Sequence, residues 1–166
     1  MTFLDRFAFI LTVIAAFGSG LIGGVFFVFS DTIMKALGRL PANEGMAAMQ
    51  QINVVILNPV FLGIFIGTAL CSAALAVSGI ARLGHPGSGY LIAGAVLFVV
   101  GSLLLTMFLN VPLNNALMAA DPSSAAGREV WDKYLTDWTF WNHVRTIASL
   151  LASIAFILAS SSASKP

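Results

Sequence analysis

Four long stretches of the sequence carry no charged residue, and polar residues gather between them. With histidine counted as neutral, these stretches cover residues 7–30, 45–81, 83–120 and 146–164. A helix that crosses a bilayer needs roughly 20 mostly apolar residues, so each stretch is long enough for one such helix. The pattern predicts membrane-spanning helices near residues 7–29, 58–80, 90–111 and 144–161.

A spanning segment must satisfy the hydrogen bonds of its own backbone, and only helices and closed barrels do so in lipid. None of the four stretches alternates between apolar and polar residues in the way of a barrel strand. We therefore expect an all-α fold, in which residues 1–166 form a single integral membrane domain built as a four-helix transmembrane bundle.

Composition agrees with a surface that faces lipid. Hydrophobic residues make up 58% of the 166 residues and charged residues only 9%, whereas soluble domains carry about 25% charged residues. The formal net charge of +1 leaves no basic patch for nucleic acid, and the single cysteine, Cys71, is interpreted as a packing residue. We expect a multi-pass protein of a bacterial inner membrane, in which small-residue pairs such as Gly63 and Gly67 leave room for a homo-oligomer.

Four spans place both ends of the chain and the short turn near residues 81–89 on one side of the membrane. The two long connections, near residues 30–57 and 112–143, lie on the other side. Lysine and arginine occur on both sides, so the positive-inside rule gives no clear orientation. A helix at the membrane interface is expected in each long connection.

The first long connection predicts a helix over residues 43–57. Asn43 is a candidate N-cap, and Asn58-Pro59 should end or kink the helix because proline lacks an amide donor and restricts the residue before it. Side chains at positions i, i+3, i+4 and i+7 share one face of this helix. They are Met46, Met49, Gln50 and Asn53.

The second long connection predicts a helix over residues 128–145 with an aromatic and polar stripe. Tryptophan and tyrosine favour the headgroup level of a membrane, so this stripe fits an interfacial belt. It also fits the aromatic wall of a substrate pocket, and the sequence leaves both interpretations open. The stripe consists of Trp131, Tyr134, Trp138, Trp141, Asn142 and Arg145.

Every span brings polar side chains to the side of the long connections. Such groups are costly near membrane depth unless they are paired, and they often mark function. They either cap helices and anchor the span ends, or form one shared site, which their convergence from all four spans favours. They are Asp31, Asn53, Asn58, Asn110, Asn114, Asn142, His143 and Arg145.

A shared site of this composition could support proton abstraction. His143 has an unperturbed pKa near neutrality and is the natural general base; because it lies off the Trp141/Arg145 stripe, we expect it to point into the bundle. Asn110, Asn114 and Arg145 would hold a substrate oxygen and stabilise an oxyanion. Asp31 would orient the imidazole or pair with Arg145. The candidate substrate-binding residues are Asn53, Asn58, Trp138, Trp141 and Asn142.

Other chemistries find less support in the sequence. Asp31, Asp137 and His143 make a weak set of metal ligands, so no metal is expected. The other histidine, His85, is predicted on the opposite side of the membrane, which disfavours a haem with two histidine ligands. A proton-coupled transporter would need carboxylates in the middle of its spans, and the four spans contain none.

Several motifs resemble the DUF1772 family, over about residues 20 to 160. The most specific is the combination of Asn110-Val111-Pro112-Leu113-Asn114 with the later Trp141-Asn142-His143-Val144-Arg145. The resemblance also includes residues 26–30, 33–37 and 47–53, Asn58-Pro59 and Trp138.

This family includes the membrane anthrone oxygenases of polyketide pathways, which convert anthrones to anthraquinones with molecular oxygen and are generally regarded as needing no cofactor. The resemblance implies a small membrane oxygenase that takes a lipophilic, anthrone-like or phenolic substrate from the bilayer. A base, an oxyanion holder and an aromatic pocket are what such a reaction needs. If His143→Ala kept full turnover, the role assigned to His143 would be wrong.

The alternative is a membrane module without enzymatic activity, which binds a lipid or a quinone-like ligand or scaffolds a partner protein. The asparagines would then be helix caps and the tryptophans an interfacial belt. A dry, closed end near Asn58, Asn110 and His143 would favour the module. A cavity open sideways to lipid would favour the enzyme.

Overall fold

The computed structural model describes residues 3–163, and within that range it contains only helices and short connections. Four helical segments are long and apolar enough to cross a membrane, and they confirm the four predicted spans. The protein is accordingly an integral membrane protein with an all-α fold. The four segments are Arg6–Leu37, Pro59–Ala81, Ser88–Ala119 and Ala125–Ser162.

The first half of the chain contains two spans with one short helix between them. The first span continues to Leu37, beyond its expected end near residue 29, because a wide π-helical turn carries the helix onward without a break. The elements are α1 (Phe3–Val28), the π-helical turn η1 (Phe29–Ile33), α2 (Met34–Leu37), α3 (Ala42–Val55) and α4 (Pro59–Ala81).

The second half contains the other two spans. The helix expected over residues 128–145 is present, but it is continuous with the last span because no glycine or proline occurs between Arg128 and Ala163 to break it. The elements are α5 (Ser88–Phe98), the π-helical segments η2 (Val99–Leu104) and η3 (Thr106–Asn110), α6 (Val111–Ala119) and α7 (Ala125–Ala163).

Local capping explains where the helices of the long connections begin. α3 starts at Ala42 with Pro41 as its N-cap, so the expected cap at Asn43 is wrong; the extended backbone of Pro41 starts the helix earlier. Asn58 instead caps α4, where its Oδ1 accepts from the amides of Val60 at 3.1 Å and Phe61 at 3.0 Å.

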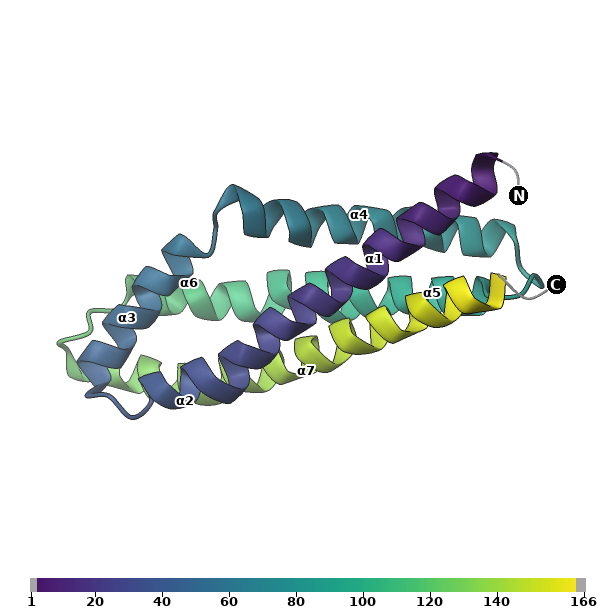
Figure 1. The fold of residues 1–166 in the computed structure, drawn as a ribbon. Coiled ribbons are helices and arrows are strands. Elements are labelled where there is room, and N and C mark those ends of the chain that lie inside the picture. The colour runs from purple at the N-terminus through teal and green to yellow at the C-terminus, as the bar shows by residue number, and fades with distance from the viewer. Residues whose placement is uncertain (1–2, 164–166) are drawn as a thin grey trace.

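The four spans form a closed bundle in which each helix has two main neighbours (Figure 1). α1 packs against α7 and α4, and α5 packs against α4 and α7. The start of α1 and the end of α7 lie at the same end of the bundle as the turn between α4 and α5, as the even number of spans requires. Helices α2, α3 and α6 gather at the opposite end.

Two buried clusters hold these elements together. In the middle of the bundle, the Phe65 ring packs edge-on against Phe26 and Phe98, with centroids 6.0 Å apart in both cases, a favoured geometry for aromatic pairs. At the end with the long connections, Met46 and Met49, which were predicted to share one face of α3, are buried in a cluster with Trp131, Tyr134 and Trp138 of α7.

The small-residue pairs differ in where they lie. A Cβ added to Gly23 would come within 2.9 Å of Leu150, so this glycine lets α1 approach α7 closely. Gly63 and Gly67 on α4 have no neighbouring atoms within 4 Å of such a Cβ. The Gly63 and Gly67 pair is therefore on the outside of the bundle, and a homo-oligomer stays a prediction.

Candidate functional site

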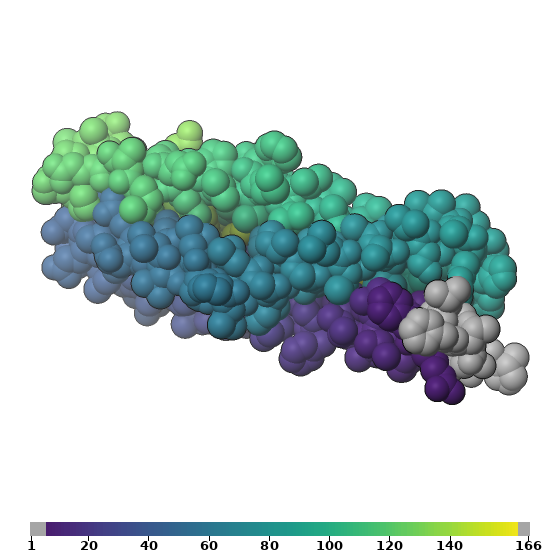
Figure 2. Space-filling view, turned by 90° about the horizontal axis from the view of Figure 1, so that it is seen from above, coloured from purple at the N-terminus to yellow at the C-terminus, as the bar shows by residue number. Residues whose placement is uncertain are grey.

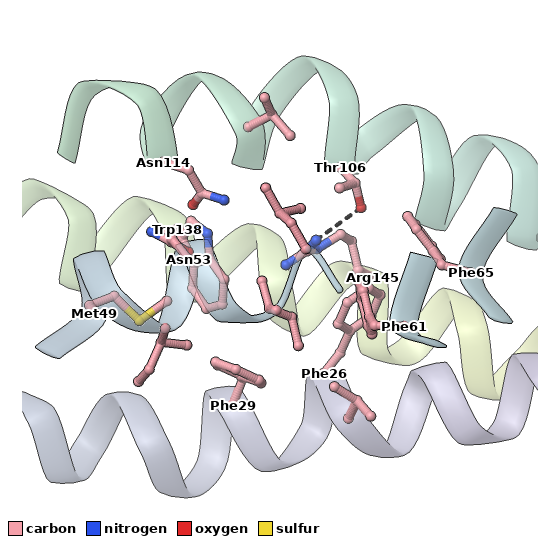
Figure 3. A pocket seen from close by; sticks show the side chains of 15 residues that line it. Phe26, Phe29, Met49, Asn53, Phe61, Phe65, Thr106, Asn114, Trp138 and Arg145 are labelled. Carbon is pink, nitrogen blue, oxygen red and sulfur yellow. Dashed lines mark hydrogen bonds between the residues drawn. The ribbon is translucent and has the colours of Figure 1, made fainter. Parts of the chain in front are cut away.

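A cavity of about 90 Å³ lies between the four spans, toward the end with the long connections. Side chains from the end of α1 and from η1, α3, α4, η3, α6 and α7 line it. Phe26, Phe29, Phe61, Phe65 and Trp138 make its wall largely aromatic (Figure 3). Its polar lining side chains come from Asn53, Thr106, Asn114 and Arg145.

Two of the π-helical segments lie at this cavity. A π turn inserts one residue into a helix and so changes which side chains face a neighbour; such turns are frequent at functional sites. In η1, Phe29 lines the cavity and Ser30 is buried. In η3, Thr106 lines the cavity and Asn110 is buried. The π turns thus bring polar groups of two spans to the interior, next to α7.

Arg145 is the most unusual side chain of the site. It is only 4% exposed, and its Nη1 donates to Thr106 Oγ1 at 2.9 Å while its Nη2 donates to Asn142 Oδ1. The guanidinium carbon lies 4.2 Å from the centroid of the Phe26 ring and 5.4 Å from that of Trp138. Figure 3 shows the side chain extending into the cavity toward Thr106.

This guanidinium has no acidic partner among the side chains that the structure describes. Asp31 was expected to orient the His143 imidazole or to pair with Arg145, and both expectations are wrong: Asp31 is exposed and forms an ion pair with Lys35, one helical turn further along. Arg145 Nε is buried without a hydrogen-bond partner in the described part of the chain. A buried cation with an unused donor next to a cavity is suited to bind an anionic or strongly polarised oxygen.

Asn142 holds the guanidinium in place from behind. It is fully buried, its Nδ2 donates to the Phe26 carbonyl at 2.6 Å and to Ser30 Oγ, and its Oδ1 accepts from Arg145. Asn142 does not line the cavity. It connects α7 to the end of α1 and fixes Arg145, so its position differs from the direct substrate contact that we expected.

A second polar group lies at the other end of the cavity. Tyr134 donates its hydroxyl proton to Asn114 Oδ1 at 2.8 Å and accepts a longer hydrogen bond of 3.4 Å from Asn53 Nδ2. Both asparagines line the cavity. Figure 3 shows them beside Trp138, on the side away from Thr106 and Phe65.

The aromatic stripe of α7 faces inward. The rings of Trp131, Tyr134 and Trp138 are stacked, with neighbouring planes inclined by 15° and 18°, and all three side chains are at most 5% exposed. These three residues therefore do not form an interfacial belt. Trp138 is a wall of the cavity, as the second interpretation of the stripe predicted.

Other expected site residues lie away from the cavity. Asn58 is the cap of α4. Asn110 is buried but does not line the cavity; its Nδ2 donates to the Trp138 carbonyl at 3.2 Å. Trp141 is half-buried and packs against Phe140, with ring centroids 5.0 Å apart.

The orientation expected for His143 is wrong. Its side chain is exposed on the outside of the bundle and is not part of the cavity lining. Successive residues of a helix are about 100° apart. Because Asn142 and Arg145 face inward, His143 falls on the outer face of α7 with the exposed Phe140 and Ile147.

The sequence did give a signal for two site residues that we did not select. Tyr134 is spaced three and four residues from Trp131 and Trp138, the spacing of one helical face. Thr106 and Ser102, four residues apart, are the only hydroxyl side chains between Leu91 and Leu109 in an otherwise apolar run. The phenylalanines gave no such signal, since phenylalanine occurs throughout the spans.

No group of three or more histidine, cysteine, aspartate or glutamate side chains suited to a metal ion occurs within residues 3–163. Asp31, one of the weak candidates, is engaged with Lys35. The cavity lining contains neither histidine nor carboxylate among the described residues.

The cavity opens on the side of the bundle. Figure 2 shows a hollow between the blue segment that contains α3 and the start of α4 and the green segment of η3 and α6, with yellow-green α7 visible at its floor. Two lining residues on these segments, Leu57 and Val111, are 62% and 38% exposed. The opening is thus flanked by apolar side chains.

In a comparison with known families, residues 59–155 match the family described as anthrone oxygenase. This is the family that the sequence motifs resemble. The matched range includes Thr106, Asn114, Trp138 and Arg145 of the cavity. A search of curated proteins and a search of solved structures each find no match.

Proposed function

This chain belongs to the anthrone oxygenase family, and on that premise we propose that it is a membrane oxygenase that oxidises a lipophilic, anthrone-like or phenolic substrate with molecular oxygen and without a cofactor. The observation that carries the proposal is the guanidinium of Arg145. It is buried, aimed into an aromatic cavity, and without a carboxylate partner among the described side chains.

Arg145 would stabilise the anionic form of the substrate. An anthrone carries a carbonyl oxygen across the central ring from an acidic CH₂ group. Removal of one of these protons delocalises the negative charge onto the oxygen, and a guanidinium beside that oxygen favours the anion. In a cavity that excludes water this attraction is stronger than in solution.

The remaining chemistry can proceed on the substrate itself. The carbanion gives electrons to O₂ and forms a C–O bond, and the resulting peroxide takes up a proton. Loss of water then breaks the O–O bond and the second C–H bond and leaves a ketone. One CH₂ group and one O₂ thereby become one C=O group and one H₂O, with the substrate as the only reductant.

No side chain of the described cavity is an obvious base, so we assign proton removal to water or hydroxide at the mouth. Arg145 would act by making the substrate more acidic, rather than by taking the proton. His143 could serve as the base only for a substrate bound outside the bundle, because its side chain is on the outer face of α7.

The size of the cavity limits how the substrate binds. A cavity of about 150 Å³ is known to hold benzene, so about 90 Å³ is too small for a complete tricyclic substrate. The edge that carries the reacting oxygen would enter, while the rest lies in the hollow between the helices. Side-chain movement of Leu57 and Val111 would widen the entrance.

The same opening supports the enzyme over a membrane module that only scaffolds a partner protein, while turnover distinguishes the enzyme from a module that binds a lipid or a quinone-like ligand. A lipophilic substrate dissolves in the bilayer and would reach Arg145 from the side of the bundle (Figure 2). A purely structural module has no need for a partly open cavity beside a buried, unpaired cation. We also propose that the protein resides in the inner membrane of a bacterium, a proposal with which helical rather than barrel spans agree.

The decisive experiment is aerobic turnover of anthrone by the purified protein in detergent, followed by the absorbance of anthraquinone. The wild-type protein should exceed the spontaneous rate, and Arg145→Met should lose most of the excess. Stoichiometric uptake of O₂ after metal chelation and dialysis would support a reaction without a cofactor. A wild-type rate equal to that of buffer would refute anthrone as the substrate.

A further inference from the structure

The end of the cavity away from Arg145 offers one hydrogen-bond donor and one acceptor. Asn114 Oδ1 is engaged by the hydroxyl of Tyr134, which leaves its Nδ2 unused. Asn53 Nδ2 is directed at the same hydroxyl oxygen, which leaves its Oδ1 unused. Neither of these two atoms bonds to another residue within the described chain.

Tyr134 fixes the orientation of both amides. Its hydroxyl can donate only one proton, which goes to Asn114, and it accepts from Asn53 on the oxygen. The Tyr134 side chain is itself 1% exposed and stacked between Trp131 and Trp138. The donor of Asn114 and the acceptor of Asn53 are therefore held in place before any substrate binds.

We propose that Asn53 and Asn114 form a specificity site for a hydroxyl group on an outer ring of the substrate. This inference rests on the proposed function, in which Arg145 holds the other oxygen. A hydroxyl both donates and accepts, so it can donate to Asn53 Oδ1 and accept from Asn114 Nδ2. An ether or a ketone can only accept and would leave Asn53 Oδ1 unpaired.

The positions of the two polar ends agree with this assignment. Figure 3 shows Asn53 and Asn114 near one end of Trp138, and Arg145 near Thr106 at the other. A substrate that lies along the indole would place two oxygens at the two ends, with its ring against the aromatic wall. Sites built to bond a hydroxyl discriminate strongly against analogues that lack it.

The test compares anthrone derivatives that carry either a hydroxyl or a methoxy group at the same carbon of an outer ring. We expect the wild-type protein to favour the hydroxyl derivative by about tenfold to a hundredfold in kcat/KM, the effect of leaving one acceptor unpaired. Asn53→Leu should abolish this preference, because the lost acceptor served only the hydroxyl. Asn114→Leu should lower kcat/KM for both derivatives, because the hydroxyl and the methoxy oxygen both accept from the Asn114 amide that is lost.

Two further variants distinguish a loss of the specificity site from a general folding defect. Tyr134→Phe removes one oxygen and frees both amides to rotate, so the preference should fall although the ring stack remains. Gln50→Leu is the matched control: this α3 amide bonds to the carbonyls of Leu117 and Ala120 and does not line the cavity. Its preference for the hydroxyl derivative should equal that of the wild type.

The failure of this inference can be told apart from failure of the proposed function. A wild-type protein that oxidises both derivatives equally, or an Asn53→Leu protein that keeps the preference, would overturn the specificity site alone. If no derivative is oxidised, quenching of tryptophan fluorescence still measures binding, since Trp138 lines the cavity. Equal affinity for the two derivatives would then refute the site, and a preference that Asn53→Leu removes would support it.

Discussion

The guanidinium carbon of Arg145 lies 4.2 Å from the centre of the Phe26 ring, so a full positive charge rests on an aromatic face inside a membrane protein. The centroid of the Trp138 ring is 5.4 Å from the same guanidinium carbon. Cation–π contacts of this kind stabilise a desolvated cation by up to about 2 kcal/mol each. They hold the charge in place without neutralising it, which a carboxylate would do.

The first prediction concerns Arg145 itself. Arg145→Met keeps much of the side-chain volume but removes the charge, and we expect turnover to fall by about a hundredfold to a thousandfold, the range for loss of a group that stabilises an oxyanion. Stability should change little, because the gain from removing a desolvated cation is offset by the hydrogen bonds that Asn142 and Thr106 lose. Anthraquinone formation and thermal unfolding in detergent measure the two effects.

Arg128→Met is the matched control for this substitution. Arg128 lies on the same helix but is exposed, so its variant should keep wild-type turnover. Arg145→Lys should have intermediate activity, because an ammonium group keeps the charge but cannot reproduce the forked contact with Thr106 and Asn142. Equal losses in Arg145→Met and Arg128→Met would point to a general effect of charge rather than to the cavity.

The second prediction tests whether His143 is the general base that the sequence suggested or a surface residue with no part in the reaction. His143 is on the outer face of α7, so His143→Ala should keep turnover within about twofold of the wild type, as expected for a surface substitution. The pH dependence of the rate should also stay unchanged. A loss of tenfold or more would restore His143 as the base and would place the reaction outside the cavity.

The difference between these two residues shows how far the sequence could be interpreted. The spans were predictable because lipid tolerates few charges, and runs free of charge are visible directly. The inward face of α7 was also visible, since Trp138, Asn142 and Arg145 are spaced by four and three residues. The predicted orientation of His143 was wrong because neighbouring side chains of a helix point about 100° apart. Only the packing of the helix decides which of these directions faces inward.

The π-helical turns were beyond what the sequence could give. An inserted residue in η3 changes the register of the third span, so that Thr106 reaches Arg145 while Asn110 turns to the Trp138 carbonyl. No residue type specifies such a turn, which forms because tertiary contacts compensate for its poorer backbone geometry. Asn110 was therefore expected at the substrate and is found between helices instead.

The third prediction tests whether Arg145 must remain unpaired. Asn142→Asp would place a carboxylate where the amide oxygen now accepts from Arg145. The ion pair would partly neutralise the guanidinium, and we expect turnover to fall about tenfold or more, although Arg145 is intact. Anion binding should weaken in parallel, which can be measured by competition with a phenolate inhibitor.

Asn142→Asp also loses the amide donor to the Phe26 carbonyl and Ser30. The effect of losing these structural hydrogen bonds must be distinguished from the effect of neutralising Arg145. Thermal unfolding of the variant reports that loss. Asn142→Leu, which removes the same donor without adding a charge, should be as unstable but should retain more activity than Asn142→Asp. The reverse order of activity would mean that neutralisation of Arg145 is not the cause.

The fourth prediction concerns the opening on the side of the bundle. Val111 lies at the rim of the cavity and is 38% exposed. Val111→Trp should narrow the entrance and lower kcat/KM for an anthrone about tenfold, which corresponds to about 1.4 kcal/mol. Val96→Trp places the same ring on an exposed position of α5, away from the cavity, and should have no effect. Similar rates for both variants would show that substrate enters by another route.

The fifth prediction concerns packing between α5 and α7, which are neighbouring helices of the bundle. Gly94 is where α5 approaches Phe156 of α7, and a Cβ added there would lie 2.8 Å from the Phe156 ring. Because Phe156 is fully buried, it has no free space to move into. We expect Gly94→Ala to destabilise the fold by about 1–3 kcal/mol, the usual cost of overpacking.

Gly89→Ala is the control on the same helix, since a Cβ there meets no atom within 4 Å. Alanine is the better helix former by up to about 1 kcal/mol, so this variant should be as stable as the wild type or slightly more stable. Unfolding in a denaturing detergent, followed by the circular dichroism of the helices, compares the two. If Gly94→Ala proved as stable as Gly89→Ala, α5 and α7 would be able to separate slightly at no cost. The contact between these two spans would then be adaptable, and α7, which carries Trp138 and Arg145 of the cavity, would not be held rigidly by α5.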